Sequence, residues 1–198
     1  MLFALALAAA AAPSFDCAKA ATEVETIICS DKEVAAVDRA AAKLYSGIAR
    51  SERKKLFPSQ VEWLKERDRC EDRNCLLAAY DERFFDLFSA STTPTRNYKS
   101  AESNGSLSIL DAGGGWYAFN VVGLWIGSNP GQVNTTMEVG HFRLRKGTAE
   151  SPAGKDYCGW RIERLSQDRW AFTELRPNYP DMIGCGGLNA TATGIYKR

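Results

Sequence analysis

The sequence predicts an α+β protein, in which a small disulfide-bonded helical domain precedes an antiparallel β-sheet or small barrel. Up to about residue 88, apolar residues recur at spacings of three and four, as in amphipathic helices. Later segments are short runs of β-branched and aromatic residues separated by Gly, Asn, Pro and Asp, which is typical of strands. We divide the chain into a signal peptide at 1–12, a helical domain at 13–90, a linker at 91–106 and a β-rich domain at 107–198.

The first residues, MLFALALAAAAAPSFDC, have the apolar run and Ala-rich end of an export signal, with cleavage expected near Ala12. No Lys or Arg precedes the run, as an export signal would require, so either the start site is misassigned or a few further residues lie upstream. The other interpretations are an Ala-rich tail and a short membrane anchor, but about twelve apolar residues fall short of the roughly 20 that span a bilayer. We therefore expect a periplasmic or secreted protein with no integral membrane association after cleavage.

The first two helices follow from their capping residues. Residues 18–28 contain few helix breakers, and Asp16 is positioned as an N-cap. Ser30 is the expected cap of the next helix, with Glu33 as its capping-box partner. One apolar stripe marks the buried face of this second helix: Val34, Val37, Ala41, Leu44 and Ile48.

Two more helices complete the first half. Proline fits the first turn of a helix but not its middle, so either a helix starts at Pro58 or one beginning near Ser51 is kinked. The apolar positions after it are Val61, Trp63 and Leu64. The last helix carries a longer stripe: Leu76, Leu77, Tyr80, Phe84, Leu87 and Phe88.

The second half begins after a Ser/Thr-rich stretch, SASTTPTRNYKSAESNGS, that lacks periodicity. The expected strands are WYAFNVVGLW, TTMEVGHFRLRKG, WRIERL, RWAFTEL and NATATGIYKR. Such short, evenly spaced strands predict an antiparallel sheet or barrel. Cys158 opens one strand and Cys185 precedes the last, so we pair them with each other.

Six cysteines in an exported chain predict disulfides. The spacing of Cys70 and Cys75 is not that of a redox motif, and the only histidine, His141, is too remote for a zinc site. Three pairings of the four N-terminal cysteines exist. Cys17 and Cys29 flank a predicted helix of about eleven residues, roughly 16 Å long, whereas a disulfide needs Cα atoms within about 7 Å. We therefore favour bonds from the first helix to the corner between the third and fourth helices, in an open order.

Several motifs of the first half occur in the order of a known family. They are Phe15-Asp16-Cys17, Glu25-x-x-Ile28-Cys29, Leu44-Tyr45, Gln60-x-x-Trp63-Leu64-x-x-Arg67-Asp68-x-Cys70, Cys75-Leu76 and Tyr80-x-x-Arg83. Residues 15–88 thereby resemble the N-terminal domain of LprI-like lysozyme inhibitors. The segment from Cys158 to Tyr196 looks like the β segment found behind this domain in some exported bacterial proteins. The resemblance implies an exported bacterial protein with a helical disulfide-bonded domain that inhibits a lysozyme.

The chain departs from the lipoproteins of that family at Cys17. Ser14, Phe15 and Asp16 precede it, in place of the small residues that lipidation requires, so we expect a soluble product.

Gln60, Trp63 and Arg67 lie at i, i+3 and i+7 and share one helix face. This family-motif face either binds a partner or forms a semi-buried polar network with carboxylates such as Glu25. We favour the network because a buried Arg must be paired.

The sequence does not predict an enzyme. His141 lies beside Arg143 and Arg145 without a nucleophile elbow. Glu62 and Glu66 are spaced as a solvated helix face, and no cofactor or metal site is expected.

The expected function is that of a lysozyme-inhibitor-like protein, with a basic c-type lysozyme as the first candidate partner. A net charge of +1 gives no basic stripe for nucleic acid. The candidate lysozyme-contacting residues form an acidic corner: Glu66, Asp68, Glu71 and Asp72.

The alternative is a non-catalytic envelope binding module whose β domain holds a glycan, peptide or small ligand. Four tryptophans would then either stack on the ligand or fill the core: Trp116, Trp125, Trp160 and Trp170.

Overall fold

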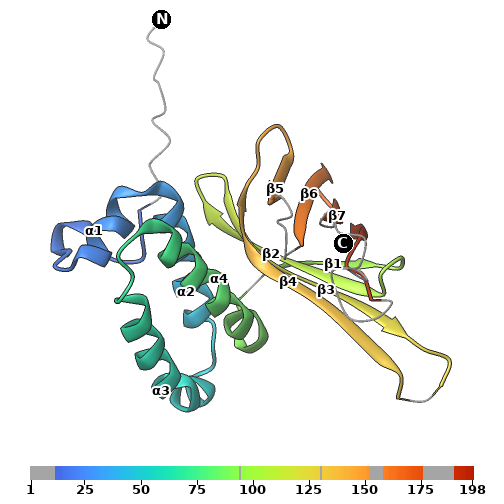
Figure 1. Cartoon of the computed structure of the whole chain (residues 1–198), viewed down its shortest axis with the longest axis horizontal. Helices are drawn as coiled ribbons and strands as arrows, with labels where there is room; N and C mark the ends of the chain where they lie inside the picture. Colours follow the sequence, from blue (N-terminus) through green and yellow to red (C-terminus); the bar gives the residue numbers. More distant parts are fainter. Residues whose placement is uncertain (1–11, 94, 130, 152–157, 176–189) are drawn as a thin grey trace, which may run out of the picture. The chain divides into compact units, whose positions relative to one another are not determined.

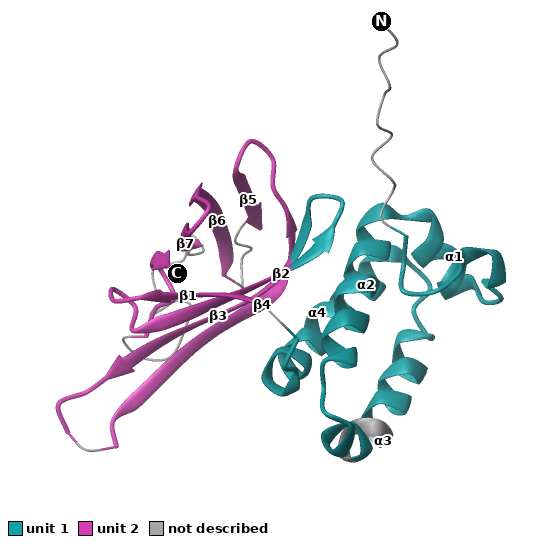
Figure 2. Cartoon of the chain, turned by 180° about the vertical axis from the view of Figure 1, so that it is seen from behind, with its two compact units in different colours: residues 1–93, 111–117 teal, residues 94–110, 118–198 magenta. Residues whose placement is uncertain are grey.

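The computed structural model describes residues 12–93, 95–129, 131–151, 158–175 and 190–198 (Figure 1). It confirms the α+β class, with helices in the first half and an eight-stranded sheet in the second. The chain divides into two compact units, shown in Figure 2. The helical unit comprises residues 1–93 with 111–117, and the β unit comprises residues 94–110 with 118–198.

The helical unit contains a 3₁₀ turn and four α-helices: η1 (Cys17–Lys19), α1 (Glu23–Ser30), α2 (Lys32–Ser46), α3 (Arg50–Arg67) and α4 (Arg73–Ala90). The helix predicted over 18–28 is therefore two shorter elements. A capping box starts α1, because the Thr22 hydroxyl accepts from the Glu25 N–H at 3.1 Å and the Glu25 carboxylate accepts from the Thr22 N–H at 3.2 Å. Asp16 does cap the preceding 3₁₀ turn.

The predicted cap of α2 is wrong by one residue. Ser30 ends α1, and Asp31 caps α2 by accepting from the N–H groups of Glu33 and Val34. A carboxylate has more acceptor capacity than a hydroxyl and suits the positive N-terminal end of a helix dipole.

The core of the helical unit lies between α2 and α4, with α1 packed on α2 and α3 packed on α4. The whole predicted stripe of α2 is buried, as are the α4 residues Leu76, Tyr80, Phe84 and Leu87. Helix α3 runs as one helix from Arg50 to Arg67, so no new helix starts at Pro58 and the helix begins near Ser51, as in the second alternative. The residues of α3 whose side chains are described are exposed or only partly buried.

The β unit is a nearly closed, barrel-like sheet with the strand order β4-β3-β2-β1-β8-β7-β6-β5. Its strands are β1 (Arg96–Ser100), β2 (Gly105–Gly113), β3 (Trp116–Ile126), β4 (Val133–Arg143), β5 (Thr148–Ser151), β6 (Gly159–Ser166), β7 (Arg169–Leu175) and β8 (Gly194–Lys197). The strand β1 lies inside the segment 91–106 that we expected to be a linker. The C-terminal strand β8 joins the two halves of the sheet, pairing with β1 through Lys197 and with β7 from Gly194 onward.

Aromatic side chains fill the interior of the sheet. Phe119 is fully buried, with its ring centroid 4.9 Å from Trp160, 5.7 Å from Phe142 and 6.0 Å from Phe172. Trp170 is 1% exposed and Trp160 is 8% exposed, so these two tryptophans belong to the core. Trp116 and Trp125 are partly exposed.

The disulfide pairing differs from the one that we favoured. The bonds are Cys17–Cys29, with Cα atoms 5.8 Å apart, and Cys70–Cys75, with Cα atoms 5.4 Å apart. The break between η1 and α1 turns the chain back, so the distance computed along an unbroken helix does not apply. Cys158 is also disulfide-bonded, and its predicted partner Cys185 lies outside the described residues.

Candidate functional site

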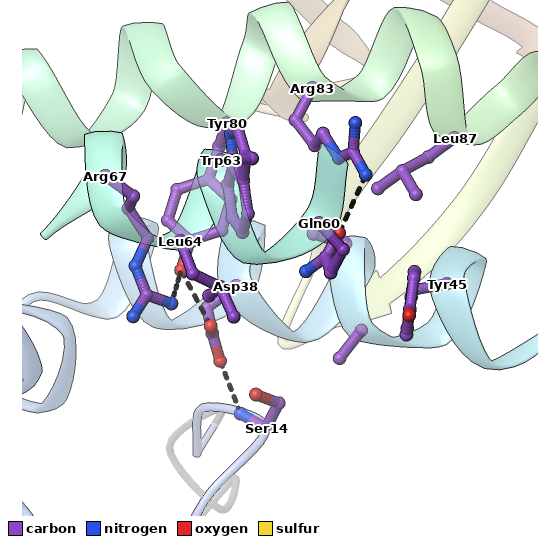
Figure 3. Close-up of a pocket in the computed structure, with 12 residues that line it drawn as sticks. Ser14, Asp38, Tyr45, Gln60, Trp63, Leu64, Arg67, Tyr80, Arg83 and Leu87 are labelled. Carbon is purple, nitrogen blue, oxygen red and sulfur yellow. Dashed lines mark hydrogen bonds between the residues drawn. The ribbon is translucent and has the colours of Figure 1, made fainter. Parts of the chain in front are cut away.

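A cavity of about 140 Å³ opens between α2, α3 and α4 of the helical unit (Figure 3). Each helix contributes side chains to it, and the segment before η1 contributes Ser14. The lining residues are Ser14, Asp38, Ala41, Ala42, Tyr45, Gln60, Trp63, Leu64, Arg67, Tyr80, Arg83 and Leu87.

A buried carboxylate forms one wall of the cavity. Asp38 is 5% exposed, and its two oxygens accept from the Tyr80 hydroxyl at 2.7 Å and from the Ser14 N–H at 2.6 Å. Burial and the neighbouring Asp38 carboxylate raise the pKa of Tyr80 well above its ordinary value. Tyr80 therefore remains a donor at any physiological pH, and Asp38 ties the segment at Ser14 to the core.

Trp63 also lines the cavity. Its indole N–H donates to the Ala79 carbonyl at 3.2 Å, and its ring meets Tyr80 edge to face at a centroid distance of 5.3 Å. The guanidinium carbons of Arg67 and Arg83 lie 5.6 and 5.8 Å from the centroid of the same ring. Cations at this distance are attracted by the ring quadrupole, so Trp63 is held by a hydrogen bond, a ring contact and two guanidinium groups.

The two arginines are paired at the edges of the cavity. Arg67 donates to the Asp68 carboxylate at 2.6 Å and, at 3.4 Å, to the Tyr80 hydroxyl. Burial opposes the charge of Arg67, but Tyr80 and Asp68 outweigh it and raise its pKa. Arg83 is 5% exposed and donates to Asp86 and to the Gln60 amide oxygen, both at 2.8 Å.

The structure thus brings Gln60, Trp63 and Arg67 together on one wall. Arg67 forms its ion pair with Asp68, and Arg83 forms its ion pair with Asp86. Glu25, the partner that we expected, is affected by Arg67 only through the electrostatic lowering of its pKa. The Glu25 pKa is lowered first by the backbone N–H groups of Ala21 and Thr22. A binding role for the family-motif face stays a prediction.

The acidic corner between α3 and α4 has most of its charges engaged. Glu66 pairs with Arg69 at 2.6 Å, and Asp68 pairs with Arg67. Asp72 caps α4 by accepting from the Cys75 N–H at 2.8 Å. Glu71 is exposed at the tip, beside the Cys70–Cys75 disulfide.

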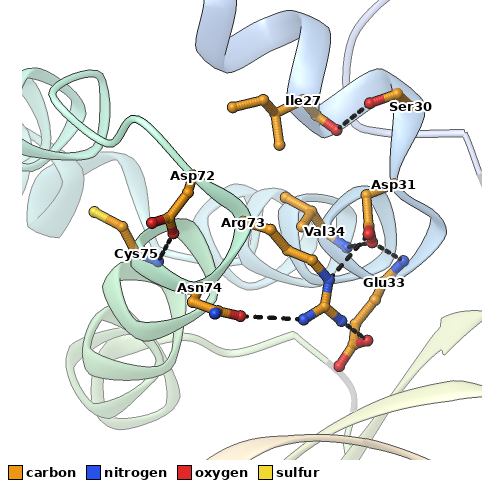
Figure 4. Close-up of polar contacts among 9 residues, drawn as sticks. All are labelled: Ile27, Ser30, Asp31, Glu33, Val34, Asp72, Arg73, Asn74 and Cys75. Atoms are coloured by element: carbon orange, nitrogen blue, oxygen red, sulfur yellow. Dashed lines mark hydrogen bonds and ion pairs between the residues drawn. The ribbon is translucent and has the colours of Figure 1, made fainter.

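Arg73 fastens this corner to the start of α2 (Figure 4). Its guanidinium donates to Asp31 at 3.0 Å and also pairs with Glu33. Although burial raises the pKa of Asp31, the N–H groups of Val34 and Glu33 and the Arg73 guanidinium outweigh it and lower the pKa.

Sequence reasoning missed Asp38 and Ser14. A signal for Asp38 was present, because it lies four residues after Val34 and three before Ala41, on the apolar stripe of α2. A carboxylate on a buried helix face must have partners, and such a position marks a polar core network. The sequence carries no comparable signal for Ser14.

His141 lies on β4 and is partly exposed. Within the described ranges, no three His, Cys, Asp or Glu residues gather in a way that could hold a metal ion. None of the described helices is both long and apolar enough to cross a membrane.

Comparison with known proteins assigns a relationship to the helical part of the chain. Residues 17–101 match the family model described as "Lysozyme inhibitor LprI", which confirms the resemblance seen in the motifs. Proteins named "Lipoprotein LprI" from Mycobacterium bovis and Mycobacterium tuberculosis are 29% identical over 106 residues, or 49% of this chain and 54% of theirs. The chain therefore spans about half the length of the curated relatives it matches. No solved structure matches, and the family match stops before most of the β unit.

Proposed function

We propose, from the similarity of residues 17–101 to lysozyme inhibitors of the LprI family, that this protein is exported and inhibits a lysozyme by binding it. That similarity is the observation that carries the proposal. The expected compartment is the periplasm or the exterior, in line with the export-like start of the sequence. A basic c-type lysozyme remains the first candidate partner.

The corner between α3 and α4 is the contact surface that we propose. Three interactions constrain it: the Cys70–Cys75 bond, the hydrogen bond from the Cys75 N–H to Asp72 and the ion pair between Arg73 and Asp31. A rigid loop loses little conformational entropy on binding, which favours affinity. Because Glu66 and Asp68 already have Arg partners, exposed Glu71 is the residue from which we expect the largest single electrostatic contribution.

The first test is inhibition of purified c-type, g-type and bacterial lysozymes by the oxidised protein, with a reduced sample beside it. We expect nanomolar to low-micromolar inhibition of at least one class that is lost on reduction. Absence of inhibition at tens of micromolar would reject the proposal for the enzymes tested.

The contact surface is tested by removing charge without removing structure. The variant Glu66→Gln/Asp68→Asn/Glu71→Gln/Asp72→Asn keeps side-chain size, and Asn caps a helix about as well as Asp. We expect at least a tenfold weaker affinity, with a smaller dependence on salt.

The matched control neutralises two exposed glutamates elsewhere on α3 and α4, Glu62→Gln/Glu82→Gln. It should bind like the wild type. Equal affinity for the corner variant and this control would place the contact elsewhere.

A second candidate function, an envelope binding module in the β unit, is favoured by one observation. Ile126 and Val133 are 64% and 54% exposed at the two sides of the β3–β4 connection, where the Gly127 N–H donates to the Gln132 carbonyl at 2.8 Å. Exposed apolar surface marks an interaction site when it is contiguous, and the second candidate requires that these two side chains form such a surface. If the Ile126→Ser/Val133→Ser variant bound envelope glycans and peptides as the wild type does, this surface would have no such role.

A further inference from the structure

The cavity of the helical unit combines a free volume with hydrogen-bond donors that have no acceptor among the described residues, and the proposed lysozyme contact does not use either of them. We propose that it is a ligand site for a carboxylate carried on an apolar group about the size of one benzene ring. The inference is independent of lysozyme inhibition, since it concerns the space between α2, α3 and α4 and not the corner.

The size of the ligand follows from the volume and the walls. Cavities of about 150 Å³ with apolar linings accept benzene, and this one measures about 140 Å³. Space is left on the α2 side because Ala41 and Ala42, which lie between Asp38 and Tyr45 in the sequence, contribute only methyl groups, while Leu64 and Leu87 come from the other two helices. Trp63 adds an aromatic wall, so an aromatic or branched aliphatic group fits best.

The polar groups at one end call for an acceptor. The Gln60 amide oxygen accepts from Arg83, which leaves its NH₂ group as a donor. Figure 3 shows the amide nitrogen of Gln60 on the side turned away from Arg83. Among the described residues, the buried Nε of Arg83 has no hydrogen-bond partner, which is a cost that proteins rarely leave uncompensated. A ligand oxygen at this end would accept from Gln60 and lie close to the Arg83 guanidinium.

The charge balance favours an anion over a cation. The charged groups that line the cavity are the guanidinium groups of Arg67 and Arg83 and the carboxylate of Asp38. Both oxygens of Asp38 already accept hydrogen bonds, from Tyr80 and Ser14. The acids that pair with the guanidiniums, Asp68 and Asp86, are 44% and 57% exposed and so are screened by solvent. A cationic ligand would face both arginines, whereas a carboxylate is attracted to them.

The ligand could be a free small acid or the carboxyl end of a peptide, because the recognised chemistry is the same. Benzoate represents the first source, and the tripeptide Gly-Gly-Phe with a free carboxylate represents the second. The C-terminal amide of the same peptide is the control.

The test is an NMR titration of the full, oxidised, ¹⁵N-labelled protein with benzoate, benzamide and benzylamine. We expect benzoate to shift the Trp63 indole signal and to bind at least tenfold more tightly than benzylamine. Binding of the peptide acid more tightly than benzoate, with loss on amidation, would identify a peptide terminus as the ligand. Equal or weaker peptide binding would identify a small free acid.

Two variants place the ligand. Ala42→Leu fills the cavity and removes no polar group, so it should lower benzoate affinity at least tenfold with an unchanged or higher melting temperature. Ala78→Leu makes the same substitution at an exposed position of α4 that does not line the cavity, and should bind like the wild type.

Gln60→Glu is the second variant, in case Ala42→Leu fails to fold. It keeps an acceptor for Arg83 and replaces the amide donor by a carboxylate oxygen, so benzoate binding should be lost. The proposal is overturned if benzoate shifts no cavity signal at 10 mM (roughly the weakest affinity of interest for a fragment), if benzylamine binds as well as benzoate, or if the cavity variants bind like Ala78→Leu.

Discussion

Replacement of Tyr80 by Phe removes one oxygen atom from the polar network of the helical unit. The ring is fully buried, and its edge-to-face contact with Trp63 persists in phenylalanine. The lost group is the hydroxyl that donates to Asp38 at 2.7 Å and accepts from Arg67 at 3.4 Å.

The magnitude follows from the state in which Asp38 is left. This carboxylate is 5% exposed and would retain only the Ser14 N–H as a donor. Hydrogen bonds to charged groups contribute about 1.5–3 kcal/mol. The contact with Arg67 is long, so it adds little. We expect Tyr80→Phe to lower the free energy of unfolding by about 1.5–3 kcal/mol.

The assay is urea unfolding followed by circular dichroism at 222 nm, which reports on the helical unit. With a slope of about 2 kcal/mol per molar urea, the midpoint should fall by roughly 1 M. Tyr45→Phe is the matched control, because Tyr45 lines the same cavity and, within the described part of the chain, makes no hydrogen bond through its hydroxyl. The control should change the stability by less than about 0.5 kcal/mol. Equal midpoints for the two variants would refute the idea that Asp38 depends on Tyr80.

Three further predictions concern other parts of the chain. The pKa of Asp31 is lowered in the folded protein, so the stability that its carboxylate contributes is present above its ordinary pKa of 3.8 and is lost as the pH falls through the lower folded value. In the Asp31→Asn variant, the free energy of unfolding should therefore depend less on pH below about pH 4. A pH dependence equal to that of the wild type would contradict this assignment. The Cys17–Cys29 bond joins residues that are 12 positions apart, and it restricts the unfolded chain. The variant Cys17→Ser/Cys29→Ser should therefore lower the free energy of unfolding in urea by about 3 kcal/mol. An unaltered midpoint would show that the bond does not constrain the unfolded chain. Phe119→Ala should lower the stability of the β unit by about 3–5 kcal/mol, because it empties a buried aromatic position. In thermal unfolding, the near-ultraviolet circular dichroism of the β unit should be lost at a lower temperature, while the transition of the helical unit at 222 nm stays at the wild-type temperature. A shift of both transitions would mean that the two units unfold together.

Periodicity predicted the helices and strands that bury a regular face. The stripe from Val34 to Leu44 is entirely inside because α2 exposes one side only to solvent. The strands β3, β4, β6, β7 and β8 were recognised by their β-branched and aromatic residues. The strand β1, RNYKS, was missed because only Tyr98 and Ser100 are buried and the rest of it is polar.

The site was predicted in part. The spacing of Gln60, Trp63 and Arg67 correctly placed them on one face, since that follows from helix geometry alone. Their hydrogen-bond partners depend on how three helices pack, which local spacing does not encode. The disulfide pairing failed for a related reason, because a single unrecognised cap at Thr22 converted one long helix into a turn and a short helix.

Both disulfides of the helical unit join cysteines that follow one another in the chain, at separations of 12 and five residues. An oxidant that links each thiol to the next one along the chain would therefore make both native pairs in order, before α2, α3 and α4 have met. We therefore expect that alkylation of free thiols at successive times of oxidation will trap Cys17–Cys29 and Cys70–Cys75 as the first species formed. The cross-links then set the local turns early, and the assembly of the helices is left to their apolar faces.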